Sequence, residues 1–283
     1  MAGKNESVSK TLLVAFLVCV VCGVVVATAA VSLRPVQEAN KLKDKRKNIL
    51  QAAGLYHQGV KIDDQFKSIK RKFVDIKTGD YVDTFPGSDK NIPDSYDQRK
   101  AAKDPSESFR VPDDQDIAKI KTQAQVAEVY LAYDDQGKLS RIILPVHGYG
   151  LWSTMYGFLA LQPDANTVAG FGFYEQGETP GLGGEVDNPK WKALWPGKKL
   201  FDDNGKIAID VVKHGTGSPA KADYTVDGLA GATLTTKGVD HLVRYWVSED
   251  GFGPYLKHMR AAEGSNASAN AKTDAATTDK GEA

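Results

Sequence analysis

The sequence predicts an α+β protein, with one N-terminal transmembrane helix followed by a mixed domain that has an antiparallel-rich sheet and flanking helices. Three observations support this prediction. Residues 11–33 contain no charged side chain. Strand-like segments follow one another between residues 126 and 174, joined by short turns, which is typical of an antiparallel meander. Apolar residues return to helical spacing after Leu234.

The uncharged segment at residues 11–33 is long enough to cross a membrane. Its 23 residues would span roughly 34 Å as a helix, against about 30 Å for the hydrocarbon core of a bilayer. A cleaved signal peptide is the alternative, because two lysines precede the segment and Ala27-Thr28-Ala29 resembles a cleavage site. The apolar run exceeds the roughly 7–15 residues of a typical signal-peptide core, so we favour an uncleaved anchor.

The charges beside this helix favour a cytoplasmic domain. Lys4 and Lys10 precede the helix, whereas six basic residues follow it between Arg34 and Lys47. By the positive-inside rule, this distribution would keep the large domain in the cytoplasm.

The chain divides into five parts by composition. After residue 260 there is no large apolar side chain, so the end of the chain is predicted to be disordered. The parts are a tail at 1–10, the transmembrane helix at 11–33, a membrane-proximal region at 34–120, a C-terminal domain at 121–260 and a disordered tail at 261–283.

The membrane-proximal region is predicted to contain two helices and one long surface excursion. Residues 34–55 have helical spacing and lead from the membrane to the domain. A second amphipathic helix is predicted over Ile62–Ile76, because Phe66, Ile69 and Phe73 recur at helical spacing. Residues 86–117 are rich in Asp, Pro, Ser and Lys, and we interpret them as a charged excursion on the surface.

The C-terminal domain begins with the predicted meander and ends with a helix. From Leu234 onward, Val239, Leu242, Val243 and Trp246 share one helical face, which predicts that this face is buried. The other elements are strands over 126–133, 139–146, 154–161, 167–174 and 207–212, and a short helix over 189–194.

Several classes of function are excluded by composition and missing patterns. Lys plus Arg equals Asp plus Glu, 36 each, which argues against nucleic-acid binding. Cys19 and Cys22 both lie in the apolar segment, so the remainder has no disulfide framework or cysteine-based metal site. The sequence lacks a P-loop, a dinucleotide fingerprint, a nucleophile elbow and paired metal-binding histidines. No catalytic residue and no metal site are therefore predicted.

Three glycine-rich segments are candidates for a binding site. Residues 148–152 place glycines beside aromatics, which suits the wall of a ring-binding cleft or ordinary sheet core. Residues 178–184 form a Pro-Gly turn, which is either structural or allows close approach of a flat ligand. Residues 227–235 precede the last helix, where Thr233 is either an N-cap or a hydroxyl that holds or is esterified by a phosphate.

Taken together, these segments resemble the FMN-binding domain of bacterial membrane redox pumps. The sequences ETPGLG at 178–183 and DGLAGAT at 227–233 are specific as a pair. With the single N-terminal helix, the chain is similar to the C subunit of the Na⁺-translocating NADH:quinone reductase over roughly residues 1–260. The family usually has Ser or Thr before GAT, where this chain has Ala230.

The resemblance implies a covalent cofactor. FMN would be a phosphoester on Thr233, attached by a separate flavin transferase that uses FAD, with Asp227 as part of the flavinylation motif. Lys213 would face the phosphate or the anionic edge of the ring, although a solvated surface lysine is equally consistent with its position. The resemblance also implies that residues from the first two segments surround the ring: Glu178, Thr179, Gly181, Leu182, Leu151 and Trp152.

The function implied is that of an electron-carrying subunit. The complex would oxidise NADH, reduce ubiquinone and export Na⁺, while this chain would position the flavin and bind no NADH itself. Its expected partners are the other subunits, the flavin transferase and the bilayer. Alternatives are the G subunit of the Rnf ferredoxin:NAD⁺ complex and a cofactor-free anchored binding domain. The resemblance implies a single-pass protein of the bacterial inner membrane with a periplasmic domain, in conflict with the charge count.

Overall fold

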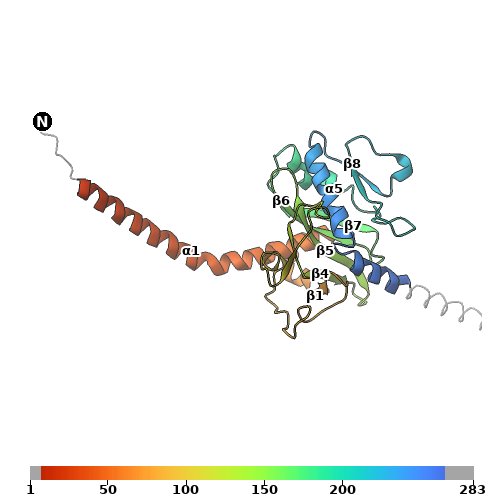
Figure 1. Ribbon diagram of the computed structural model, residues 1–283, viewed down its shortest axis with the longest axis horizontal. Helices are drawn as coiled ribbons and strands as arrows, with labels where there is room; N and C mark the ends of the chain where they lie inside the picture. Colours follow the sequence, from red (N-terminus) through yellow and green to blue (C-terminus); the bar gives the residue numbers. More distant parts are fainter. Residues whose placement is uncertain (1–7, 265–283) are drawn as a thin grey trace, which may run out of the picture. The chain divides into compact units, whose positions relative to one another are not determined.

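The computed structural model describes residues 8–264, and it separates into one compact unit that ends at Lys45 and a second that begins at Arg46. Figure 1 traces the elements along the chain. Residues 1–7 and 265–283, which include most of the two predicted tails, lie outside the described residues.

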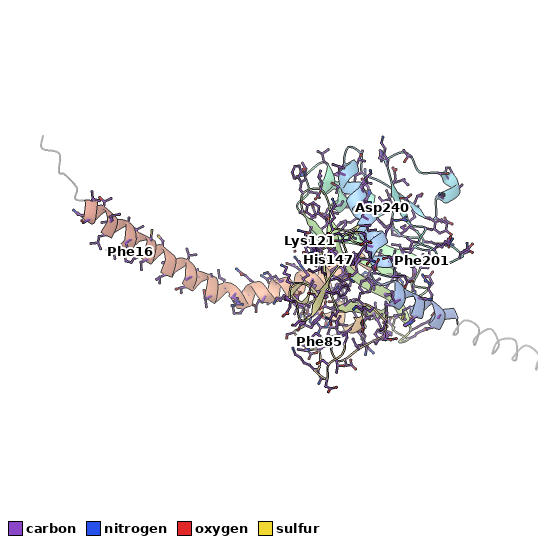
Figure 2. All side chains as sticks on the ribbon, in the orientation of Figure 1. Phe16, Phe85, Lys121, His147, Phe201 and Asp240 are labelled. Atoms are coloured by element: carbon purple, nitrogen blue, oxygen red, sulfur yellow. The ribbon has the colours of Figure 1, made fainter. Side chains whose placement is uncertain are left out.

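A single helix, α1 (Val8–Ala52), replaces the two helices predicted over 11–33 and 34–55. Its apolar part is long and hydrophobic enough to cross a membrane, and the most hydrophobic window is 0% buried. Phe16, for example, projects outward with 65% of its surface exposed (Figure 2). Pro35 lies inside the helix, at the junction between its apolar and charged halves.

The second unit is built on a five-stranded antiparallel sheet in the order β1-β4-β5-β6-β7. Four of these strands are the predicted meander; β4 and β6 match their predicted bounds, β5 extends three residues further, and β7 is shifted by one residue. The strands are β1 (Ile69–Asp75), β4 (Val126–Tyr133), β5 (Leu139–Tyr149), β6 (Thr154–Leu161) and β7 (Val168–Glu175).

Both faces of the sheet are covered, which explains why its central strands are almost continuously apolar. Val129 and Leu131 on β4 belong to the main core, whereas the intervening Tyr130 belongs to a second core on the opposite face. That second core includes Ile49 and Leu50 from the last turns of α1. Helix α5 (Thr233–Val247) belongs to the main core through its predicted apolar face, which is buried.

The prediction of a helix over Ile62–Ile76 is wrong beyond its first turns. Only α2 (Ile62–Gln65) and the 3-10 turn η1 (Phe66–Ser68) are helical, and the chain then enters the edge strand β1. β1 pairs with β4 over seven residues, from Ile69 opposite Ala132 onward, which gives its inward-facing backbone groups hydrogen-bond partners. This long-range pairing outweighs the local helical spacing.

The predicted surface excursion at 86–117 also differs from the structure. Ile92, Tyr96 and Ala101 are buried in a small third core, and the Tyr96 hydroxyl donates a 2.7 Å hydrogen bond to the carbonyl of Val126. The region contains α3 (Gln98–Ala101) and β2 (Ser108–Arg110), which pairs with β3 (Thr122–Ala124). It is therefore partly a folded cover on β4 rather than wholly an exposed loop.

The remaining elements follow β7. The 3-10 turn η2 (Gly183–Asp187) and α4 (Pro189–Lys192) lead to β8 (Asp210–Val212), which covers only the last half of the strand predicted at 207–212. After η3 (Pro219–Lys221), β9 (Thr225–Asp227) pairs with β8 in parallel, a strand that the sequence did not predict. Residues 253–264 form a last helix, which includes the first four residues of the predicted tail.

Candidate functional site

One buried carboxylate joins the three glycine-rich segments. Glu178 is 5% exposed, and the backbone N–H groups of Leu151, Trp152 and Ser153 donate to its Oε1 over 3.1, 3.0 and 3.2 Å. The Thr235 hydroxyl donates to its Oε2 over 2.7 Å. The carboxylate therefore fixes the β5–β6 turn against the first turn of α5, and we call these five residues the Glu178 cluster.

Glycines make this close approach physically accessible. A Cβ on Gly150 would lie 2.6 Å from Glu178 Oε1, and a Cβ on Gly183 would lie 2.5 Å from Thr235 Oγ1. Both distances are far shorter than real Cβ contacts, so side chains at these positions would push the three segments apart. Gly183 of the ETPGLG sequence and Gly150 of the GYG sequence thus serve the packing of the cluster.

The turn at 178–184 is held by hydrogen bonds within its own backbone. The carbonyl of Thr179 accepts from the N–H groups of Leu182 and Gly184 over 3.1 and 2.9 Å. Gly181 has a φ of 75°, a left-handed conformation that favours glycine. The side chains of Thr179 and Leu182 face outward, and both are exposed.

Thr233 is the exposed threonine at the start of α5. It occupies the first helical position, while the N-cap is Ala232 and supplies no side-chain hydrogen bond. Thr235 and Thr236 are 1% and 2% exposed, and both hydroxyls are engaged, Thr235 with Glu178 and Thr236 with the N–H of Leu229 over 3.0 Å. The interpretation of Thr233 as a simple N-cap is therefore excluded, and its hydroxyl is accessible.

Large apolar side chains of the three glycine-rich segments are exposed rather than buried. Trp152 is 66% exposed, and a Cβ on Gly231 would lie 3.4 Å from Leu182 Cδ2, so Leu182 borders the GAT segment. The sequence analysis proposed Leu151, Trp152 and Leu182 as site residues but did not propose Leu234. The position of Leu234 directly after Thr233 could have indicated it. We call the set the apolar rim, and it consists of Leu151, Trp152, Leu182 and Leu234, which are 37%, 66%, 46% and 58% exposed.

Asp227 stabilises the loop that carries Lys213. Its carboxylate accepts from the N–H of Gly215 over 2.7 Å and lies 2.8 Å from His214 Nδ1. Lys213 follows the end of β8, is exposed, and forms no salt bridge within residues 8–264. Gly228 connects this loop to the site, because its N–H donates to the carbonyl of Val212 over 2.9 Å.

The residues present fit a planar group linked through a phosphate. The first N–H groups of α5 have no side-chain cap, and such a helix N-terminus favours an anion. The Thr233 hydroxyl is exposed at the same point, and the apolar rim offers surface for a ring. Within the described part of the chain, no group of three or more His, Cys, Asp or Glu residues is arranged to hold a metal ion.

Comparisons with known proteins point to one family. The FMN-binding domain model matches residues 150–248, which span the Glu178 cluster, Thr233 and α5. The C subunit of the Na(+)-translocating NADH-quinone reductase of Pseudomonas aeruginosa is 53% identical over 265 residues, covering 92% of this chain and 98% of the relative. The same-named protein of Haemophilus ducreyi is 47% identical, covering 93% and 98%.

Solved structures give the same result. The crystal structure of NqrC from Shewanella oneidensis superposes with a TM-score of 0.69 at 40% identity, covering 78% of this chain and 99% of that chain. The crystal structure of the same-named protein from Parabacteroides distasonis has a TM-score of 0.61 at 28% identity, covering 79% and 96%. Sequence, fold and site therefore agree that this chain belongs to the NqrC family, the C subunits of the Na⁺-translocating NADH-quinone reductase, and that it has an FMN-binding domain.

Proposed function

We propose that Thr233 carries FMN as a phosphoester and that this chain passes electrons within a membrane complex that oxidises NADH, reduces ubiquinone and exports Na⁺. The observation that carries the proposal is the contrast among the threonines of α5. Thr233 is exposed at an uncapped helix start, whereas Thr235 and Thr236 are buried and hydrogen-bonded.

The chain would not form this bond by itself. A threonine hydroxyl is a weak nucleophile, so a flavin transferase is required. In that enzyme the Thr233 oxygen would attack the FMN phosphorus of FAD, lose its proton and release AMP. Asp227 would contribute by keeping the 213–215 loop in place next to β9, through its bonds to His214 and Gly215.

Bound FMN would accept and pass on electrons, and this chain's residues would position and shield it. The apolar rim would cover the ring and exclude water. The Glu178 carboxylate is already occupied by backbone N–H groups and Thr235, so its role would be to position Leu151 and Trp152. Thr179 and Gly181 would border the ring through the exposed turn at 178–184, and Lys213 would compensate negative charge on the cofactor.

We also propose that the domain is periplasmic, on a single-pass anchor in the inner membrane. Several of the basic residues that favour the opposite orientation are engaged with the rest of the chain. Arg46 pairs with Asp63 over 2.5 Å and lies over the Phe66 ring at 5.2 Å, and Lys47 lies over the Tyr56 ring at 5.6 Å. Such residues serve the domain, and a long domain can cross despite flanking charge.

The experiment that tests the tether is intact-mass analysis of the purified chain. Replacing Thr233 by Val should abolish the covalent FMN mass and the fluorescence of the band on a denaturing gel, while the domain still folds. Thr179→Val is the matched control, because Thr179 is also exposed at the site but is not the proposed attachment point. A Thr233→Val chain that still gains one FMN mass would contradict the proposal.

A further inference from the structure

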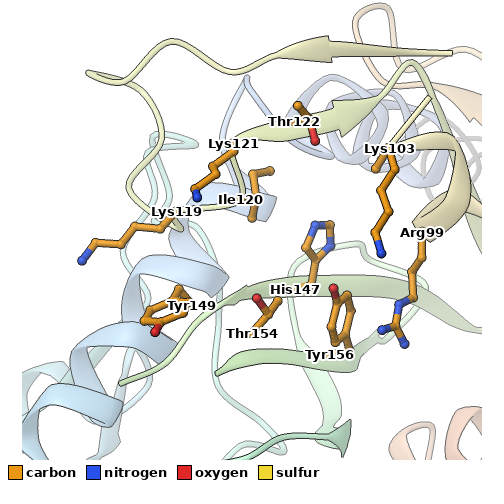
Figure 3. A pocket seen from close by; sticks show the side chains of 11 residues that line it. Arg99, Lys103, Lys119, Ile120, Lys121, Thr122, His147, Tyr149, Thr154 and Tyr156 are labelled. Carbon is orange, nitrogen blue, oxygen red and sulfur yellow. The ribbon is translucent and has the colours of Figure 1, made fainter. Parts of the chain in front are cut away.

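A cleft outside the Glu178 cluster is lined in part by Tyr149 and Thr154, which flank the β5–β6 turn. It has a volume of about 450 Å³ and lies between the region after α3 and the ends of β5 and β6. Figure 3 shows basic side chains around a central histidine, with Lys119 and Lys121 on one side and Lys103 and Arg99 on the other. The residues that matter here are Arg99, Lys103, Lys119, Lys121, His147 and Tyr156.

The positive charge of this cleft is only partly compensated. Arg99 lies over the Tyr156 ring at 3.5 Å, and its guanidinium donates to both carboxylate oxygens of Glu175 over 2.7 and 3.1 Å. The three lysines are exposed, and none of them forms a salt bridge within residues 8–264. The lining includes no Asp or Glu, so the cleft presents hydrogen-bond donors and cations.

The wall that carries two of the lysines is held in an unusual conformation. Lys119 and Lys121 have φ values of 55° and 67°, in the left-handed region that non-glycine residues rarely adopt. Asp116 stabilises it, because its carboxylate accepts from the N–H groups of Ile120 and Lys121 over 2.8 and 2.7 Å. Such backbone strain persists where the surroundings enforce it and is enriched at functional sites.

The floor of the cleft presents ring edges rather than ring faces. The His147 ring stacks on Tyr156 at 5.4 Å and lies 5.1 Å from Trp246, so its faces are covered. Burial, together with the charge of Arg99, lowers the pKa of His147 to about 4, which keeps the ring neutral at pH 7. His147 lines the cleft, and among the described residues its ring nitrogens have no hydrogen-bond partner.

The cleft shares one structural element with the apolar rim. Tyr149 and Thr154 line the cleft, while Leu151–Ser153 between them bind Glu178 through their N–H groups. The Tyr149 N–H donates to the carbonyl of Ala118 over 2.8 Å, which ties the wall of the cleft to the end of β5. A molecule held in the cleft would therefore lie beside the turn that carries Trp152.

We propose that this cleft docks an acidic segment of another subunit, whose carboxylates meet Lys103, Lys119 and Lys121. The inference rests on the proposed function, in which the chain exchanges electrons with other subunits. Electron-transfer contacts are characteristically small and charged, and charge complementarity sets their orientation and rate. A row of carboxylates fits better than one small anion, because the lysines stand on opposite sides of His147 and remain exposed (Figure 3).

The test uses the purified complex with Lys103, Lys119 and Lys121 each replaced by Glu. A matched variant replaces Lys138, Lys206 and Lys257, three exposed lysines outside the cleft, by Glu and changes the net charge equally. We expect the cleft variant to lose quinone-reductase turnover, or its retention in the complex during a salt wash, by about tenfold or more, and the control to change little. A third variant, in which the three cleft lysines are replaced by Arg, keeps the positive charge and should behave like the wild type.

Two further readouts separate the possible outcomes. Covalent FMN on this chain should be unchanged in the cleft variant. If the wild-type chain itself carried no covalent FMN, the proposed function would be contradicted rather than the docking proposal. Carbodiimide treatment of the wild-type complex should crosslink the cleft lysines to Asp or Glu of another subunit. Unchanged turnover and retention in the cleft variant would overturn the docking proposal, as would tight binding of inorganic pyrophosphate at the cleft without any effect on the complex.

Discussion

Among single residues, Glu178 is the group on which the site depends. A buried carboxylate is costly unless it is hydrogen-bonded, and this one is bonded to three consecutive backbone N–H groups and one hydroxyl. Bonds to a charged acceptor are stronger than neutral ones, so they hold the 151–153 turn in a single conformation. The positions of Leu151 and Trp152 follow from this carboxylate, although Glu178 itself does not face outward.

We therefore expect Glu178→Gln to be strongly perturbing. The amide keeps the size of the side chain and one acceptor oxygen, but it removes the negative charge that the three backbone N–H groups meet and puts an NH₂ group where an oxygen accepts from Thr235, which should lower the free energy of unfolding by about 2 kcal/mol. Trp152 emission and the flavin spectrum should shift, while covalent flavin is retained because the ester is on Thr233. Denaturant unfolding, fluorescence and intact mass measure these effects.

Thr235→Val provides the graded control, since it removes one hydrogen bond to the same carboxylate and should cost only about 1 kcal/mol. If Glu178→Gln left stability, Trp152 emission and the flavin spectrum at wild-type values, the positioning role of Glu178 would have to be abandoned.

Among the secondary-structure elements, α5 must lie very close to the β5–β6 turn. Gly238 lies in the helix interior, where glycine is normally less favourable than alanine by about 1 kcal/mol. A Cβ at this position would lie 2.7 Å from the carbonyl oxygen of Tyr149 and 2.9 Å from the Cα of Gly150. The glycine therefore sets the separation between the helix that carries Thr233 and the turn that carries Trp152.

We expect Gly238→Ala to destabilise the chain by about 2–3 kcal/mol, because the helix must move away from the turn. This is the opposite of what helix propensity alone would give, since alanine favours a helix more than glycine does. Gly264→Ala is the matched control, since Gly264 is also helical and a Cβ there meets nothing within 4 Å. Urea unfolding of the detergent-solubilised chain compares the two. A Gly238→Ala chain as stable as wild type would show that the helix–turn contact is adaptable.

For the molecule as a whole, the charges that follow the apolar helix bear on its orientation in the membrane. The described part of the chain has one helix with an apolar stretch long enough to span a bilayer, and the basic residues lie in the second half of the same helix. Arg46 and Lys47 contact Asp63, Phe66 and Tyr56, so two of the six basic residues pack within the second unit.

A reporter fusion tests the proposed orientation. Residues 253–264 are helical and Arg260 lies over the Phe201 ring at 3.9 Å, so the reporter is best joined after Ala283. Alkaline phosphatase should be active there, and a fluorescent protein that matures only in the cytoplasm should be dark. Fusions after Lys10 should give the opposite pattern. An inverted pair of results would place the domain in the cytoplasm and remove the periplasmic flavin transferase from the proposal.

Elements with a local pattern could be predicted from the amino-acid sequence. An uncharged run of 23 residues, period-2 strands joined by short turns, and a one-sided apolar helix were sufficient to predict the span, the meander and α5. The position of Thr233 at the start of that helix could also be predicted, because helix starts have a recognisable sequence pattern.

Features that depend on distant neighbours were settled only by tertiary contacts. Residues 69–75 became a strand because β4 offered a partner across more than fifty residues of chain. Glu178 turned inward because three N–H groups from the preceding β5–β6 turn and Thr235 meet there. Lys103, Lys119 and Lys121 lie around His147 only because the segment between α3 and β3 folds against the end of β5. Local periodicity carries no information on such contacts, because their free energy arises when separate segments pair and bury one another.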